Sequence, residues 1–387
     1  MGRVIPKCGF PRSKPQGQHV LNESEAPMSK TEDLRNHLHA LSTLAFSPAR
    51  AADVVPYVAG LNAGRRTHLL ALTDAHHVVL RALQPLAKAA AAVGAPEVSE
   101  FADTALTKEH ARIENALSFL EAVCGELESA GCSVVVMKTL DHWPDFGNDL
   151  DLFTQADHKM VTQLLVRKFN ASRLPRTIGD HLAGKRSYRL PGLDQDVEIH
   201  FRRLGQAGEH SDLAGRFISR RRTMQASGRR FLVPAPEERV IAGTLQRMYR
   251  HLYFRVCDTL NTATLVESGA LDYAELRAAC DIGGIWPGAA TFLEIISECL
   301  RKYRGVGLPL PAEVASSALF GAYKLFPRGR FLYFPVMPEG VVLYTRQLRH
   351  TARHGRLSAA ARLSLLPPLA SAAALAYAVV GSSERIW

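Results

Sequence analysis

Apolar residues recur at helical spacing over much of residues 31–131. The last helix predicted in this region begins with Thr107 as its N-cap and ends at Gly131. Its apolar residues lie three or four positions apart and would share one buried face. They are Ile113, Leu117, Leu120, Cys124 and Leu127. The pattern therefore predicts a long amphipathic helix just before the chain changes character.

The preceding segment, residues 66–94, is rich in alanine and leucine and is predicted to be one helix that ends at Gly94. It contains the adjacent histidines His76 and His77. Metal-binding histidines on a helix are usually four positions apart, because that spacing places them on one face. We therefore expect both histidines on the helix surface, with no metal role.

Short strands are predicted after Cys132. The run "SVVVM" is β-branched, as is typical of a buried strand, and "DLDLF" alternates polar and apolar residues with period two. The helical segment "DHKMVTQLLVRKF" follows. Two more strands, "KRSYRL" and "DVEIHF", are joined by a turn at Pro191–Gly192. The pattern over residues 132–201 thus predicts a small α/β unit.

Helix is predicted again from Pro236, because a proline followed by two acidic residues favours a helix N-terminus. Its apolar stripe consists of Ile241, Leu245, Met248, Leu252 and Val256. A basic side chain also recurs every four positions, at Arg247, His251 and Arg255. These three would share one helical face. That face either points at bound phosphates or is simply solvated, and the sequence leaves both interpretations open.

The patterns divide the chain into five parts. Residues 1–30 carry proline, glycine and charge throughout and are expected to be disordered, with Met28 as an alternative start. The other four are an N-terminal helical region, the α/β core, a C-terminal helical domain and a basic and apolar tail. They span residues 31–131, 132–234, 235–325 and 326–387.

The tail contains an uncharged stretch, residues 363–383, after several arginines. Pro367 and Pro368 would limit its helix to Leu369–Gly381, about 20 Å at 1.5 Å per residue, whereas a bilayer core is about 30 Å thick. We therefore expect this helix to pack on the protein or to associate weakly with a membrane surface rather than to cross a membrane.

Two carboxylates occur within the most strand-like segment. Asp149 and Asp151 are two residues apart, so both point to the same face of the strand. Like charges placed this close are tolerated when a cation lies between them, and Mg²⁺ prefers such oxygen ligands. Glu198 and His200 share a face in the same way on a later strand. The alternative is a solvated strand face without a ligand.

These motifs resemble the nucleotidyltransferase superfamily typified by DNA polymerase beta and kanamycin nucleotidyltransferase, and in particular a bacterial family of uncharacterised nucleotidyltransferases. That family carries an apolar-Lys-Gly element, then Asp-apolar-Asp, then an apolar-Asp-apolar-His strand and a helical C-terminal half. The matching segments here are "VVMKT" with Lys138, "DLDL" and "VEIH", within residues 132–202. Two residues depart from the pattern: Thr139 replaces the glycine, and Glu198 replaces the aspartate.

The resemblance implies an α+β fold, in which a small mixed-sheet nucleotidyltransferase core is flanked by helical regions. It also implies transfer of a nucleoside monophosphate from an NTP, such as ATP, to an acceptor, with release of pyrophosphate. Asp149, Asp151 and Glu198 would bind Mg²⁺ or Mn²⁺, and Glu198 alternatively would accept the proton of the acceptor. The phosphate charge would be neutralised by Lys138, Thr139, Arg247, His251 and Arg255.

Composition adds little to this picture. The formal net charge is +10, which suits a partner that carries phosphate. The six cysteines are scattered without a CxxC pair, as is usual in a reducing cytoplasm. A small molecule, peptide or protein is the expected acceptor. Two alternatives remain: a catalytically silent nucleotide-binding protein, which Thr139 would favour, and an RNA-directed nucleotidyltransferase, which the positive charge would favour.

Overall fold

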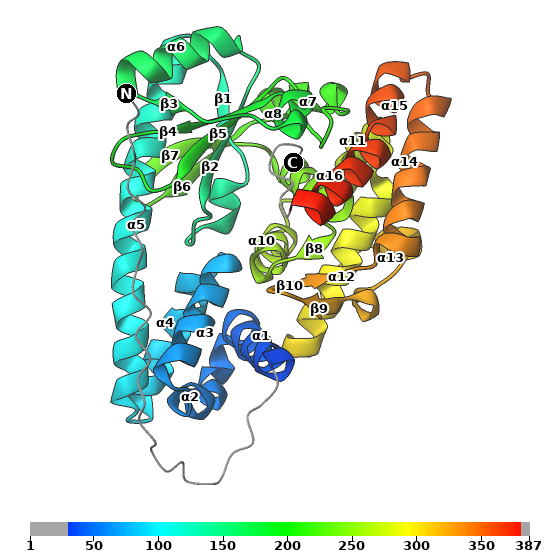
Figure 1. The fold of residues 1–387 in the computed structure, drawn as a ribbon. Coiled ribbons are helices and arrows are strands. Elements are labelled where there is room, and N and C mark those ends of the chain that lie inside the picture. Colours follow the sequence, from blue (N-terminus) through cyan, green and yellow to red (C-terminus); the bar gives the residue numbers. More distant parts are fainter. Residues whose placement is uncertain (1–29, 381–387) are drawn as a thin grey trace, which may run out of the picture.

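The computed structural model describes residues 30–380 and has the predicted mixed α+β architecture, with a five-stranded sheet at the upper left of Figure 1, N-terminal helices below it and C-terminal helices to its right. The strand order is β1-β2-β5-β4-β3. Only β2 and β5 run parallel, and the other neighbours are antiparallel. The strands are β1 (Val134–Val136), β2 (Asp149–Thr154), β3 (Ser172–Arg173), β4 (Lys185–Arg189) and β5 (Asp196–Phe201).

Shorter elements surround this sheet. A hairpin follows it along the chain and packs against β1 and a long N-terminal helix. The hairpin consists of β6 (Arg222–Ala226) and β7 (Arg229–Val233). The helices within this part of the chain are α6 (His158–Phe169), α7 (Ile178–Ala183) and α8 (Ser211–Ser219), together with the one-turn segment η2 (Thr139–His142). Leu150 and Leu152 of β2, both fully buried, contribute to the core beneath the sheet.

The N-terminal helices are α1 (Lys30–Phe46), α2 (Ala51–Ala59), α3 (Ala63–Ala75), α4 (Val79–Ala92) and α5 (Pro96–Ser129). α5 runs along one side of the molecule, past both the other N-terminal helices and the sheet (Figure 1). It begins at Pro96, so the prediction that Thr107 is its N-cap is wrong. The Thr107 hydroxyl instead donates to the carbonyl of Asp103, one turn earlier. A proline at the first helical position fixes this earlier start.

Residues 66–94 form parts of two helices rather than one, and the prediction that the two histidines lie on the helix surface is wrong. The chain breaks at residues 76–78, where His77 has a φ of 51°. His76 and His77 are both buried. His76 joins distant segments: its Nδ1 accepts a hydrogen bond from the Val256 amide (2.9 Å), and its Nε2 donates to the Arg330 carbonyl (2.7 Å). This pattern requires the neutral imidazole.

The predicted helix through residues 236–256 is also interrupted. It consists of α9 (Pro236–Thr244) and a π-helical turn, η3 (Leu245–His251). Leu252, with a φ of 55°, ends the turn, and β8 (Tyr253–Phe254) follows. The apolar stripe predicted through Leu252 and Val256 therefore does not lie on one helix. Pairing of β8 with β10 replaces helical hydrogen bonds here, an example of tertiary structure overriding local periodicity.

The remaining C-terminal helices and strands follow η3 along the chain; α11 and α12 pack against α9, and α12 and α14 pack against η3. They are α10 (Val256–Glu267), α11 (Tyr273–Gly283), α12 (Trp286–Arg304), α13 (Ala312–Ser317), β9 (Phe326–Arg328), β10 (Phe331–Tyr333), α14 (Val341–Arg353), α15 (Leu357–Ser364) and α16 (Leu366–Val380). The predicted boundary at residue 325 falls directly before β9, which joins β8 in a three-stranded sheet through β10.

The tail helix α16 begins three residues earlier than predicted and includes Pro367 and Pro368. Prolines are tolerated in the first turn of a helix, because the amide groups there have no helical partner. Within residues 30–380, no helix is both long and apolar enough to span a bilayer. The predicted disorder of residues 1–30 falls almost wholly outside the described residues, as does Met28.

We expect acid to destabilise this fold through His76. Burial lowers the pKa of His76 from 6.5 to about 4. Above pH 6.5 the imidazole is neutral in both states and its contacts contribute fully. As the pH falls from 6.5 to 4, the unfolded chain takes up a proton that the folded protein resists, and about 3 kcal/mol of unfolding free energy is lost.

Urea denaturation at several pH values tests this expectation. His76→Gln should reduce the dependence of unfolding free energy on pH between 6.5 and 4. His68→Gln, which alters an exposed histidine of α3, should leave that dependence as in the wild type. An unchanged pH dependence in His76→Gln would show that His76 is not the group responsible.

Candidate functional site

The parallel pairing of β2 and β5 determines the candidate site. Asp151 lies directly opposite Glu198 in the register, and Asp149 lies opposite Asp196. The alternating residues of both strands, Leu150 and Leu152 in β2 and Val197 and Ile199 in β5, are buried in the core. Because side chains alternate along a strand, the acidic residues of the two strands are held on the opposite face.

Three side chains converge on that face and could hold a metal ion. One ligand atom from each of Asp151, Glu198 and His200 lies within 4.8 Å of the other two. His200 Nε2 is 2.9 Å from Glu198 Oε1 and 3.4 Å from Asp151 Oδ1. Carboxylate oxygens suit Mg²⁺ and Mn²⁺, and an imidazole is also a common ligand of transition metals. The predicted ligands Asp151 and Glu198 are thus brought together, and His200, whose role the sequence leaves undecided, joins them.

Asp149 lies outside this group, at the open end of the site, with its side chain exposed to solvent. Desolvation by the surrounding protein and, after it, the neighbouring charges of Asp151 and Glu198 together raise the pKa of Asp149 to about 6. A nearby cation would relieve this repulsion. Asp149 therefore remains available as an additional ligand for an ion bound at the edge of the group.

Two lysines balance the carboxylates. Lys138, directly before η2, places its Nζ 2.5 Å from Asp151 Oδ1 and 4.0 Å from Glu198 Oε1. Lys185 of β4 places its Nζ 2.6 Å from Glu198 Oε2. Sequence reasoning missed Lys185, because a lysine near the end of a strand carries no signal of its own; only the β4–β5 register brings it to Glu198.

Glu198 is ionised in this arrangement. Burial acts to raise its pKa, but the hydrogen bond from His200 and the charges of His200, Lys138 and Lys185 outweigh it. Together they hold the pKa of Glu198 well below the usual range of a glutamate. A carboxylate stabilised in this way is a good cation ligand and a weak base.

The Thr139 hydroxyl lies inside the protein rather than facing a phosphate. The residue is 1% exposed, and its Oγ1 accepts a hydrogen bond from the Asp151 amide (2.7 Å) and donates to the Asp149 carbonyl (3.3 Å). These bonds attach η2 to the start of β2 and fix the backbone that carries both aspartates. In this structure Thr139 is a positioning residue.

The predicted basic face of Arg247, His251 and Arg255 does not exist as such, because the helix ends at Leu252. Arg247 is 1% exposed, and its Nε lies 2.7 Å from Asp258 Oδ2. His251 is half-buried and packs against the Tyr253 ring. Burial and then the charges of Arg250, Arg247, Arg255 and Lys138 keep its pKa well below 6.5. Neither residue presents a charge to solvent.

Arg255 is placed differently. Its guanidinium lies over the Phe331 ring (5.3 Å), and its Nη1 contacts His77 Nε2. The His77 ring in turn lies 3.6 Å from the position that a Cβ would take on Gly147, two residues before Asp149. Arg255 therefore approaches the open end of the site through His77, a contact that sequence periodicity does not reveal.

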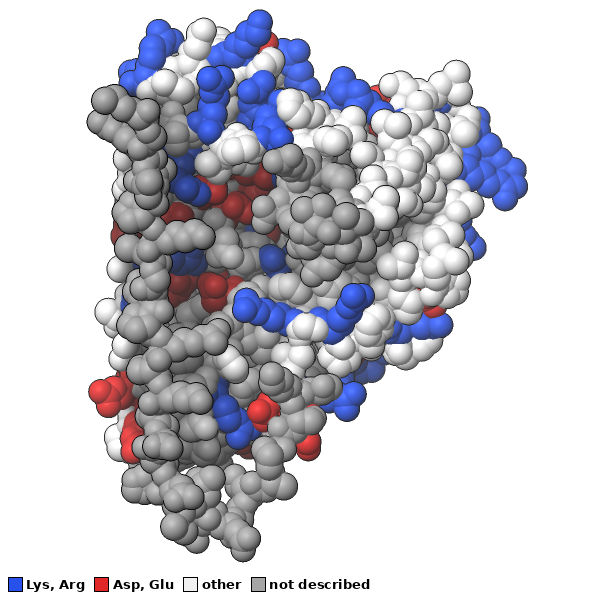
Figure 2. All heavy atoms as spheres, viewed as in Figure 1, with Lys and Arg blue, Asp and Glu red and all other residues white. Residues whose placement is uncertain are grey.

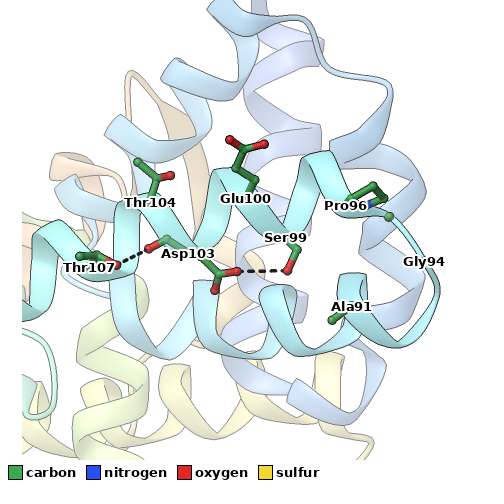
Figure 3. Close-up of a pocket in the computed structure, with 9 residues that line it drawn as sticks. Ala91, Gly94, Pro96, Ser99, Glu100, Asp103, Thr104 and Thr107 are labelled. Carbon is green, nitrogen blue, oxygen red and sulfur yellow. Dashed lines mark hydrogen bonds between the residues drawn. The ribbon is translucent and has the colours of Figure 1, made fainter.

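A small cavity lies beside the candidate site, and a wider depression lies between two N-terminal helices. Beside Lys138 and His200 is a cavity of about 50 Å³, enough for water but not for a nucleotide. Figure 2 shows acidic side chains in a recess near the middle of one face of the molecule, with Lys and Arg side chains close by. A wider depression lies between α4 and α5 (Figure 3). Among the described residues that line it, only Glu100 and Asp103 are charged, so it offers no positive charge to a phosphate.

Comparison with known proteins shows distant similarity to a solved structure. No family model matches the chain, and no curated protein matches it. Among solved structures, it is similar to an antigenic nucleotidyltransferase-like protein from Paracoccidioides brasiliensis, with 17% identity and a TM-score of 0.30. The similarity covers 42% of this chain and 84% of that one. A TM-score of 0.30 is too low to establish a common fold.

We expect Thr139→Val to destabilise the protein by about 1–3 kcal/mol, because it leaves the buried Asp151 amide without a hydrogen-bond partner. Thr139→Ser keeps the hydroxyl and should recover most of this loss. Urea unfolding of both variants measures the difference. Equal losses of unfolding free energy in Thr139→Val and Thr139→Ser would show that the Thr139 hydroxyl does not stabilise the start of β2.

Proposed function

We propose that the protein is a metal-dependent nucleotidyltransferase that moves a nucleoside monophosphate from an NTP to an acceptor and releases pyrophosphate. The observation that carries this proposal is the β2–β5 register, which sets Asp151 beside Glu198 and His200, with Asp149 on the same face of β2. Paired carboxylates on adjacent strands match the ligand set that divalent metals need when they bind phosphates.

The side chains divide the work as follows. Asp149 and Asp151 would hold Mg²⁺ or Mn²⁺, which when bound supplies Lewis-acid stabilisation of phosphoryl oxygens. Glu198, with its lowered pKa, serves as a further ligand rather than as the proton acceptor. His200 orients Glu198 through the 2.9 Å contact between Nε2 and Oε1.

The nucleotide is proposed to bind at the open end of the site. The 50 Å³ cavity next to His200 is too small for it, whereas Asp149 is exposed. Arg255 lies toward this end, and its guanidinium has two aromatic rings and His77 as neighbours. We assign Arg255 to the triphosphate, whereas Arg247 keeps a structural role because Asp258 already pairs with it.

A catalytically silent nucleotide-binding protein is the alternative, since Thr139 replaces a glycine that would let the backbone approach phosphate closely. Pyrophosphate release from ATP, CTP, GTP or UTP, tested with small-molecule, peptide and RNA acceptors, separates the two. Metal-dependent NTP binding without any pyrophosphate release would favour the silent protein.

The aspartates provide the first test. The double variant Asp149→Asn, Asp151→Asn should lose Mg²⁺-dependent NTP binding in isothermal titration and remain folded. Its melting temperature without metal should stay close to that of the wild type, because the relief of carboxylate repulsion is offset by the loss of the Lys138–Asp151 ion pair. Asp194→Asn, which changes an exposed carboxylate in the β4–β5 turn, is the matched control and should bind as the wild type does. Equal NTP affinity in the double variant would refute the assignment.

Arg255 provides the second test. Arg255→Met should weaken NTP binding by about tenfold, as expected for the loss of one charged contact to phosphate. Arg328→Met is a matched control, because Arg328 is exposed and also lies over an aromatic ring, that of Tyr333. Fluorescence titration with a labelled NTP measures both. If the two variants bound the nucleotide equally well, Arg255 would have no part in the site.

A further inference from the structure

The side-chain nitrogen of Lys138 lies among the three groups that could hold a metal ion. Its Nζ is 2.5 Å from Asp151 Oδ1, 3.5 Å from His200 Nε2 and 4.0 Å from Glu198 Oε1. An ammonium in this position supplies the positive charge that the carboxylates need. It also fills the space between the ligand atoms, so a metal ion and this ammonium cannot occupy it together.

The backbone at Lys138 is unusual as well. Its φ of 64° and ψ of −51° place it at the centre of a tight γ-turn, closed by a 2.7 Å hydrogen bond from the Thr139 amide to the Met137 carbonyl. This conformation is strained for a residue with a side chain and persists only where surrounding contacts hold it. Here the hydrogen bond that the buried Thr139 hydroxyl accepts and the Lys138–Asp151 ion pair both stabilise the turn.

Lys185 behaves differently, although it carries the same charge. Its Nζ lies between Glu198 and Asp180, 2.6 Å and 3.1 Å away, so it has an acidic partner outside the metal-binding group. Within the described residues, the ion pairs of Lys138 are with Asp151 and Glu198 alone. Entry of a divalent ion would therefore displace Lys138 and leave Lys185 in place.

We propose that Lys138 is an internal counter-ion that competes with the metal for the carboxylates. This inference rests on the metal site of the proposed function. Free divalent cation binds weakly, because it must displace an ammonium that has no other acidic partner in the described part of the chain. A cation that arrives with a triphosphate binds more readily, because the displaced Lys138 then pairs with phosphate oxygens. Lys138 thereby couples metal binding to nucleotide binding.

Binding of free Mn²⁺, followed by the electron paramagnetic resonance signal of the unbound ion, tests the competition without nucleotide or turnover. Lys138→Met should bind Mn²⁺ at least tenfold more tightly than the wild type. Lys185→Met removes an equal charge beside Glu198 and should have a much smaller effect. Lys168→Met, in an exposed ion pair with Glu126, should have none. Lys138→Gly, which accepts the positive φ without strain, replaces Lys138→Met if that variant does not fold.

Equal gains in Lys138→Met and Lys185→Met would overturn the inference, because they would reflect general charge rather than competition for one position. Unchanged or weaker Mn²⁺ binding in Lys138→Met would overturn it as well. Mn²⁺ binding to no variant would remove both the inference and the metal site. Tighter Mn²⁺ binding in Lys138→Met, with no binding of ATP, CTP, GTP or UTP to the wild type, would support the counter-ion and refute the nucleotidyltransferase.

Discussion

Repulsion among the carboxylates of two adjacent parallel strands is the constraint on which the rest of the site depends. The β2–β5 register sets Asp151 directly opposite Glu198, with Asp149 farther along the same face of β2. Such a cluster is tolerable only with positive charge close by. In this structure Lys138 and Lys185 supply that charge, and burial of leucine, valine and isoleucine on the other face prevents the strands from turning the acids outward.

The surrounding elements serve to hold this pair of strands. The Thr139 hydroxyl attaches η2 to the start of β2, so the turn that carries Lys138 and the strand that carries the aspartates form one unit. α5 packs on β1 and on the N-terminal helices, and His76 ties the α3–α4 break to α10 and to the β9–β10 turn. The helical regions on both sides of the sheet therefore meet near the open end of the site.

Much of the core follows from local patterns. The period-two alternation of "DLDLF" and "DVEIHF" predicts both strands and the shared face of Asp149 and Asp151, and the resemblance of the motifs implies that Glu198 joins them. The positions of the basic residues near η3 could not be predicted from local patterns. Helical spacing groups Arg247, His251 and Arg255, but β8 pairs with a strand some eighty residues later and ends the helix between them. His77, Lys185 and the position of Lys138 likewise depend on contacts between distant segments.

The most direct measurement is anomalous diffraction from crystals grown with Mn²⁺ and an NTP analogue that cannot be cleaved between its α and β phosphates. The account predicts a manganese peak within about 2.2 Å of carboxylate oxygens of Asp149 and Asp151. It also predicts that Lys138 Nζ has moved from Asp151 to the phosphates. A manganese ion bound elsewhere, with Lys138 still paired to Asp151 and the nucleotide away from β2, would contradict it.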